Sequence, residues 1–150
     1  MKCFMTMFFL IFSVSVFSED LPLNINTQVK SIEAQKGDLD SLNLTVQSSE
    51  LENSAPQVAY YYESENNTLR LARITSSKGI FLVVYSYYFK DGEPLKYLVE
   101  YIDHPDNLPK QAIIYSDGKV IWSNVEVPVQ EPHFILESFN ASLENITRFR

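Results

Sequence analysis

The chain of 150 residues contains a single cysteine, Cys3, which precedes an apolar run from Phe4 to Phe17. The run follows Lys2 and is succeeded by Ser18, a pattern typical of a secretory signal peptide that is cleaved after this serine. A retained membrane anchor is the less favoured alternative, because a spanning helix needs about 20 apolar residues. After cleavage the protein would contain no disulfide, no thiolate nucleophile and no cysteine ligand for a metal. We therefore expect an exported protein, either periplasmic or secreted.

Glycine and histidine are also scarce, with four glycines and two histidines in the whole chain. The sequence has no Gly-x-Ser-x-Gly elbow of a serine hydrolase, no glycine-rich phosphate loop and no calcium-binding loop. A carboxylate pair for glycoside hydrolysis stays open, because 19 acidic residues always allow one, but no pair stands out. The sequence thus favours a protein that is not an enzyme, and we expect no cofactor and no metal.

One polar loop contains residue types that could carry chemistry. His104 is flanked there by Asp103 and Asp106, and imidazole with carboxylate is a common set for metal binding or proton transfer. The same residue types also occur in solvated turns for reasons of backbone conformation, and His133, the second histidine, is not at ligand spacing. We interpret the segment as a turn and retain Asp103, His104 and Asp106 as a candidate polar loop.

Basic residues are few as well, since 12 Lys and Arg stand against 19 Asp and Glu, for a formal net charge of −7. An acidic surface repels both nucleic acid and anionic lipid. We therefore expect no nucleic-acid partner and no membrane span after signal cleavage. The charge suits a soluble domain, and it also suits a basic protein partner.

What the chain has in abundance is alternating apolar and aromatic residues between positions 79 and 122. In the segment 80–89 the even positions are apolar at first and turn polar at Ser86, which predicts a strand whose second face is buried only in its first half. Asp117-Gly118 lies between two apolar runs and predicts a hairpin with a type I′ turn, and Asp91-Gly92 predicts another turn. The odd positions are expected to form one continuous core face: Phe81, Val83, Tyr85, Tyr87 and Phe89.

Shorter alternating segments flank this stretch and are joined by connections too short for crossover helices, which predicts antiparallel pairing. Towards the C-terminus the period changes, because Leu136, Phe139, Leu143 and Ile146 form one stripe of an amphipathic helix. A shorter helix is expected from a cap at Asn26 or Thr27 to Gly37, holding Val29 and Ile32. We expect the C-terminal helix to cover Ile80, Leu82 and Val84.

The predicted fold class is α+β: a single antiparallel β-meander of about five to six strands, with the C-terminal amphipathic helix and the short N-terminal helix packed on it. The alternative is a small β-sandwich or barrel with peripheral helices. We expect residues 1–18 to be the signal peptide, residues 19–27 a linker and residues 28–150 the single domain.

Tyrosine is enriched at contact surfaces and is also favoured in strands. The tyrosines of the sheet are therefore interpreted either as core residues or as a candidate binding face formed by Tyr60, Tyr61, Tyr62, Tyr88 and Tyr101. Four Asn-x-Ser/Thr sequons are candidate glycan acceptors if the protein is eukaryotic, although the lack of disulfides favours a bacterial envelope: Asn43, Asn66, Asn140 and Asn145.

Together these features predict an exported, non-enzymatic domain that binds another protein, as an inhibitor or an immunity-type protein does. The alternative is a carrier of a small ligand, or an unrecognised hydrolase, with a pocket between sheet and helix. No motif in the chain is specific enough to name a family.

Overall fold

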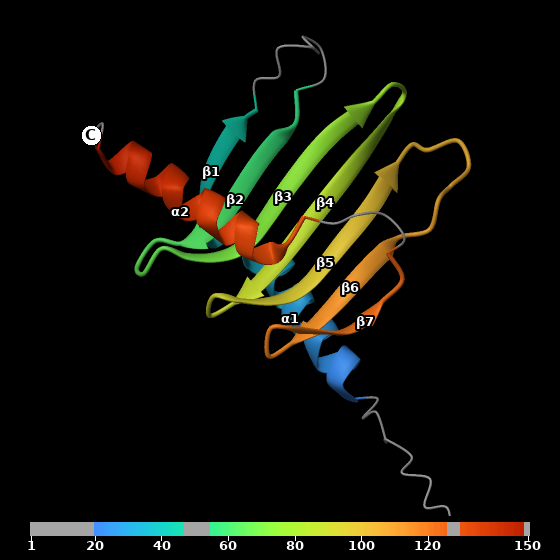
Figure 1. Cartoon of the computed structure of the whole chain (residues 1–150), viewed down its shortest axis with the longest axis horizontal. Helices are drawn as coiled ribbons and strands as arrows, with labels where there is room; N and C mark the ends of the chain where they lie inside the picture. The colour runs from blue at the N-terminus through green and yellow to red at the C-terminus, as the bar shows by residue number, and fades with distance from the viewer. Residues whose placement is uncertain (1–19, 47–54, 126–129, 149–150) are drawn as a thin grey trace, which may run out of the picture.

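Seven antiparallel strands form one sheet whose spatial order follows the chain, with one helix on each face (Figure 1). The computed structural model describes residues 20–46, 55–125 and 130–148. The predicted α+β meander is therefore confirmed, with seven strands instead of five or six. The predicted signal peptide and most of the loop expected after the first strand lie outside the described residues. The elements are α1 (Asp20–Gln35), the 3-10 turn η1 (Lys36–Asp38), β1 (Asp40–Thr45), β2 (Gln57–Glu63), β3 (Thr68–Lys78), β4 (Phe81–Lys90), β5 (Glu93–Ile102), β6 (Gln111–Ser116), β7 (Lys119–Ser123) and α2 (Pro132–Arg148).

Two-residue turns join the long central strands and β6 to β7. Asp117 and Gly118 both have positive φ, at 49° and 70°, and Asp91 and Gly92 likewise have φ of 51° and 84°. A type I′ turn needs positive φ at both central positions, and its twist matches that of the paired strands. The hairpin predicted from Asp117-Gly118 is confirmed, and the Asp91-Gly92 turn has the same pattern of dihedrals.

The odd positions of β4 form one core face, as predicted, but it is this face that α2 covers, whereas the sequence predicted α2 over the even positions. Phe81, Val83, Tyr85, Tyr87 and Phe89 all belong to the apolar cluster on this side of the sheet, and Phe89 is completely buried. The rings of Tyr60 and Tyr62 on β2 meet the ring of Phe139 on α2 at centroid distances of 5.4 and 5.3 Å. The α2 side of the sheet therefore holds the larger of the two hydrophobic cores.

The prediction for the even positions of β4 is wrong for Ile80 and Leu82, whereas Val84 is buried as expected, because burial increases along the strand instead of decreasing. Ile80 lies in the tight turn before β4 and is 81% exposed, and Leu82 is 39% exposed. Ser86 and Tyr88, at the other end, are 0% and 2% exposed. The physical reason is that α1 crosses this face over the second half of β4 and α2 packs on the opposite face.

Helix α1 is also longer than predicted. It begins at Asp20, so residues 20–27 are helical and not a linker, and Asn26 and Thr27 lie inside the helix instead of capping it. Ile25, Val29 and Ile32, spaced four and three residues apart, form its apolar stripe. They pack against side chains of β3, β4 and β6, which are Leu71, Tyr88 and Ile114. The buried Ile25 thus belongs to the helix, although it lies before Asn26, the residue that the sequence suggested as the helix cap.

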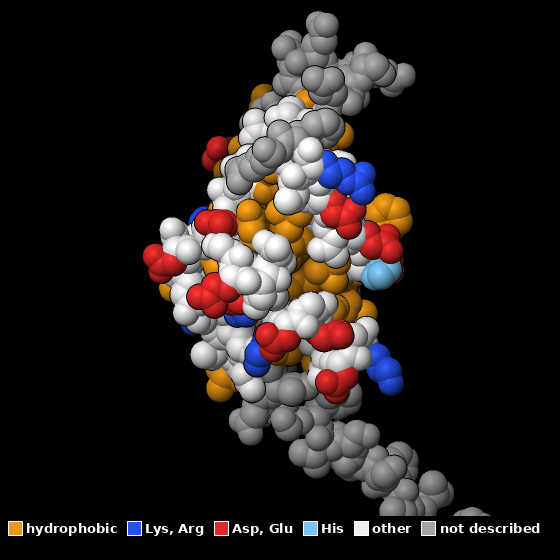
Figure 2. All heavy atoms as spheres, turned by 90° about the vertical axis from the view of Figure 1, so that its left-hand side faces the viewer, with side chains coloured by type: hydrophobic (Ala, Val, Ile, Leu, Met, Phe, Trp, Pro, Cys, Tyr) orange, Lys and Arg blue, Asp and Glu red, His pale blue; other side chains and the backbone are white. Residues whose placement is uncertain are grey.

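The view from the β1 side shows a band of hydrophobic side chains through the middle of the molecule, with mostly acidic side chains around it (Figure 2). On β1 itself Leu42 and Leu44 are partly buried against the α2-side core, and the other residues of the strand are exposed. Within the described residues no helix is long and apolar enough to cross a membrane.

The role of α2 in the larger core leads to a prediction about Phe139, which is 1% exposed. Phe139→Ala is expected to lower the free energy of unfolding by about 3–5 kcal/mol, because it leaves a cavity between Tyr60 and Tyr62. Phe134→Ala on the same helix is the matched control, since Phe134 is 60% exposed, and it should change the stability by less than about 0.5 kcal/mol. Urea unfolding followed by circular dichroism measures both, and equal effects would contradict this packing of α2.

Candidate functional site

The candidate polar loop between β5 and β6 is folded around His104, whose side chain is 16% exposed. The imidazole meets the ring of Phe81 edge-on at a centroid distance of 4.5 Å, and that of Tyr101 at 6.0 Å. Its Nδ1 accepts the backbone N–H of Asp106 at 3.2 Å, and its carbonyl accepts the backbone N–H of Asn107 at 3.0 Å. His104 therefore has a packing role and covers the end of the α2-side core.

The two aspartates of this loop do not converge on a reaction centre. Asp103 is exposed with φ of 59°, and the side chain of Asp106 is 82% exposed. An oxygen of Asp106 lies 3.9 Å from Nδ1 of His104, but this nitrogen already accepts a backbone N–H and so has no proton to share. Among the described residues no group of three His, Cys, Asp or Glu could hold a metal ion. The alternative that the protein is an unrecognised hydrolase therefore gains no support from this loop.

The five tyrosines proposed as a binding face do not form one surface. Tyr60 and Tyr62 lie on the α2 side of β2 and Tyr101 on the same side of β5, whereas Tyr61 and Tyr88 lie on the α1 side. Tyr60 and Tyr88 are each 2% exposed and belong to the two cores. Alternation along β2 sends neighbouring rings to opposite faces, so the prediction of a single tyrosine face is wrong.

Four other tyrosines gather on the α2 side of the central strands. Tyr97 stacks on Tyr85 at a ring-centroid distance of 6.4 Å and meets Tyr87 at 4.7 Å. Burial is the main cause that raises the pKa of Tyr85, Tyr87, Tyr97 and Tyr115. Because a raised pKa keeps a phenol protonated, these side chains are neutral at physiological pH and contribute packing and hydrogen bonds.

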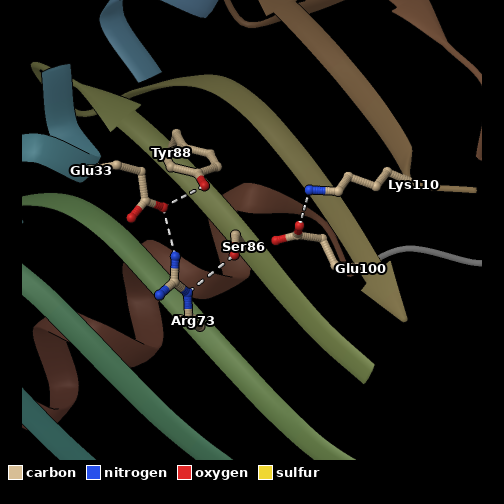
Figure 3. A network of polar contacts seen from close by, with 6 residues as sticks. All are labelled: Glu33, Arg73, Ser86, Tyr88, Glu100 and Lys110. Carbon is tan, nitrogen blue, oxygen red and sulfur yellow. Dashed lines mark hydrogen bonds and ion pairs between the residues drawn. The ribbon is translucent and has the colours of Figure 1, made fainter. Parts of the chain in front are cut away.

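A polar network on the α1 side holds the N-terminal helix against the sheet (Figure 3). Arg73 on β3 donates to Oε1 of Glu33 on α1 at 2.6 Å, and the hydroxyl of Tyr88 on β4 donates to the same oxygen at 2.7 Å. The Nε of Arg73 also donates to the hydroxyl of Ser86 at 3.4 Å. Burial, with the hydrogen bond to Glu33 and its charge, raises the pKa of Tyr88. Each member is therefore bound by another, and the network positions α1 instead of presenting a free catalytic group.

Helix α1 covers only part of its face of the sheet. Leu82 and Ile102 are directly paired across β4 and β5 on the uncovered part, and they are 39% and 43% exposed. Ile80, in the adjoining turn, is 81% exposed. These three residues form an apolar surface that we call the open end of the α1 face. An exposed cross-strand pair of branched apolar side chains on an ordered sheet is suited to contact with another apolar surface.

A pocket of about 420 Å³ lies on the same face, between α1 and the strands β5 to β7. Leu98, Ala112 and Ile114 contribute apolar side chains to its lining. Two lysines also line it, which are Lys96 on β5 and Lys110 just before β6. A register shift in the pairing of β6 with β7 falls beside Trp122, and Trp122 lines the pocket while its neighbour Ile121 packs against the α1 side.

The charged groups of this pocket are held by specific partners. Lys96 donates from Nζ to Oδ1 of Asn26 on α1 at 2.9 Å, and Lys110 forms an ion pair with Glu100 (Figure 3). Burial lowers the pKa of Lys96, and the positive charge of Lys110 adds to this effect. Asn124 is occupied by the backbone, because its Oδ1 accepts the N–H of Ala112 at 2.6 Å. Lys96 and Lys110 are therefore the charged residues that line this hollow, beside two asparagines and a mostly apolar remainder.

A second hollow of about 450 Å³ lies over β1 to β3 on the α1 face. Its polar lining includes Asn43, Thr45 and Arg73. The guanidinium of Arg73 is already bound to Glu33 and Ser86, so this hollow offers less free charge than the pocket at Lys96.

The four asparagines of the Asn-x-Ser/Thr sequons are all exposed in the described fold: Asn43, Asn66, Asn140 and Asn145.

Sequence reasoning missed both the polar network and the lysine pocket. Ser86 interrupts an apolar strand and Arg73 lies within another, and these two departures from alternation were the available signals for the network. No local pattern links Lys96, Lys110 and Trp122, which come from three successive segments of the sheet. Only the strand order brings them together.

The fold and these surfaces define an α+β protein with a helix on each face of a seven-stranded meander. Comparison of the chain with models of protein families, with curated protein sequences and with solved structures gives no match.

The polar network predicts a difference between two tyrosines on the α1 side. Tyr88→Phe removes the hydroxyl that donates to Glu33 and should lower the free energy of unfolding by about 1 kcal/mol. A larger loss is not expected, because the side chain of Glu33 is 33% exposed and water replaces part of the bond. Tyr61→Phe is the control, since no described residue bonds the Tyr61 hydroxyl, and it should leave stability nearly unchanged. Chemical denaturation measures the free energy of unfolding of both variants. An equal loss of stability in the two would contradict the role of the network in anchoring α1.

Proposed function

We propose that the chain is an exported, non-enzymatic protein that binds another protein through the open end of the α1 face. The observation that carries the proposal is the pairing of Leu82 with Ile102, both about 40% exposed on a strand pair whose opposite face is buried. Such side chains lose little conformational freedom on binding, because the sheet already holds their backbone. An apolar centre of this kind is typical of the middle of a protein interface.

The charges around the open end indicate what kind of partner it suits. Asp103 follows Ile102 directly and is exposed, and Asp106 lies further along the same loop with its side chain 82% exposed. With the net charge of −7, these carboxylates favour a partner that has apolar side chains in the centre of its contact surface and basic side chains around them. In this proposal the polar loop supplies the rim of an interface and not a catalytic site.

Export is supported by the sequence of residues 1–18, in which Lys2 precedes an apolar run from Phe4 to Phe17 and Ser18 follows it. Removal of these residues would leave every described element intact. The absence of cysteine after Cys3 also means that the exported domain needs no disulfide to close its fold. Its stability would come from the two apolar cores on either side of the sheet.

The partner proposal predicts the effect of two pairs of substitutions. Leu82→Lys with Ile102→Lys should weaken partner binding by roughly a hundredfold, because it places two charges against the apolar centre of the partner's surface and close to its basic rim. Val120→Lys with Phe134→Lys is the matched control, since both side chains are more than half exposed elsewhere on the surface. The partner is identified by affinity capture from the exported fraction of the source cells, purified, and titrated against all three proteins.

Two outcomes contradict the partner proposal. One is that the folded protein captures no partner reproducibly. The other is that the two double variants bind the purified partner equally well, which would move the interface away from Leu82 and Ile102. Circular dichroism of each variant shows that the fold is retained.

The export proposal is checked by the mass of the mature protein. When the full chain is expressed in its source cells with a C-terminal tag, the exported fraction should contain a chain that begins at Glu19. Mass spectrometry of the intact protein measures this end directly. A tagged chain that keeps Met1 and stays with the cell contents or the membrane would contradict export by a cleaved signal.

A second candidate function, a carrier of a small ligand, is favoured by the pocket between α1 and the strands β5 to β7. Its volume of about 420 Å³ falls in the usual range for small-molecule sites, roughly 300–1,000 Å³. The pocket and the open end of the α1 face contain different residues, so the two functions can be tested separately.

A further inference from the structure

The pocket between α1 and β5 to β7 carries positive charge in a protein that is acidic as a whole. Lys96 and Lys110 line it, and the nearest carboxylate partner is Glu100, which pairs with Lys110. Lys96 forms no ion pair with any described carboxylate, and its one described hydrogen bond runs to the neutral amide of Asn26. The three charged groups together leave one positive charge at the pocket, against a net charge of −7 for the chain.

The ammonium of Lys96 has capacity for a further partner. An ammonium donates three hydrogen bonds, and Asn26 accepts one of them at 2.9 Å. Both partners of this bond line the pocket, so the amide holds the ammonium at the pocket wall. Burial lowers the pKa of Lys96, because the charged form of its ammonium is less well solvated at this place than in water. A bound anion would offset this loss of solvation.

The rest of the lining is suited to an apolar group. Leu98, Ala112 and Ile114 contribute carbon surface from two adjacent strands, and the indole of Trp122 borders the same hollow. Trp122 is 48% exposed, so a ligand that covered its indole would remove a large apolar surface from water. An ion without carbon surface would leave this side of the pocket in water.

We propose that the pocket binds a small amphipathic anion, with its carboxylate at Lys96 and its apolar body between Trp122 and the floor formed by Leu98, Ala112 and Ile114. The inference rests on the second candidate function, the carrier, and specifies the class of ligand. The carboxylate completes the hydrogen bonding of the Lys96 ammonium, and Lys110, just before the neighbouring strand β6, adds electrostatic attraction. The apolar body removes the indole from water.

The chain offers a built-in probe for this pocket, because Trp122 is its only tryptophan. Fluorescence excited selectively in the indole therefore reports on the pocket itself. Octanoate added to the folded protein should change this fluorescence in a saturable way. Octanol, which has the same apolar body without the charge, should bind about tenfold or more weakly, because it forms no charge-assisted hydrogen bond with Lys96. Acetate, which has the charge without the body, should give no saturable change.

Substitutions locate the anion at the lysines. Lys96→Met should weaken octanoate binding about tenfold or more and leave octanol binding unchanged, whereas Lys96→Arg keeps the charge and should retain most of the affinity. Lys30→Met is the matched control on α1, since Lys30 is exposed and does not line the pocket. Lys110→Met provides a second variant that is safe for folding, because this side chain is 69% exposed, and it should also weaken octanoate about tenfold.

The outcomes separate this inference from the function on which it rests. Equal binding of octanoate and octanol to the unchanged protein, or full octanoate affinity in both Lys96→Met and Lys110→Met, would overturn the anion assignment and leave a neutral apolar carrier. No saturable change with either compound would overturn the carrier as well. Neither result bears on the protein partner, which is tested at Leu82 and Ile102.

Discussion

The two hydrogen bonds that Glu33 accepts from Arg73 and Tyr88 hold α1 across the sheet, and the accessible surfaces of this protein follow from where that helix lies. The helix covers the second half of β4 and leaves the first half open. The same placement puts Asn26 beside Lys96 and so closes one wall of the lysine pocket. A different crossing of α1 would bury Leu82 and Ile102 and open the pocket to solvent.

The sheet has two faces and the described chain has one long helix for each of them. On the α2 side, aromatic rings from β2, β4 and β5 supply enough apolar surface for a continuous core, and His104 closes its end. On the α1 side the core is smaller and a polar network completes it. A face that is only half covered must expose apolar residues or present them to a partner, which is why this face carries both proposed functions.

The two proposed functions use different physical chemistry on one face. The open end is flat and apolar with carboxylates beside it, which suits a protein surface. The pocket is concave, with an apolar floor and an uncompensated ammonium, which suits a small anion.

The sequence by itself determined the parts of the fold that depend on near neighbours. Asp-Gly pairs fold into their turns because positive φ is a local property, and the alternation from Phe81 to Phe89 defines a core face wherever the strand lies. The stripe of Leu136, Phe139 and Leu143 likewise predicted α2 correctly. Only the tertiary structure decided which face each helix covers, and with it the burial of Ser86, the exposure of Leu82 and the contact of Lys96 with Asn26. These features depend on contacts between segments far apart in the chain, which the local periodicity of the sequence does not reveal.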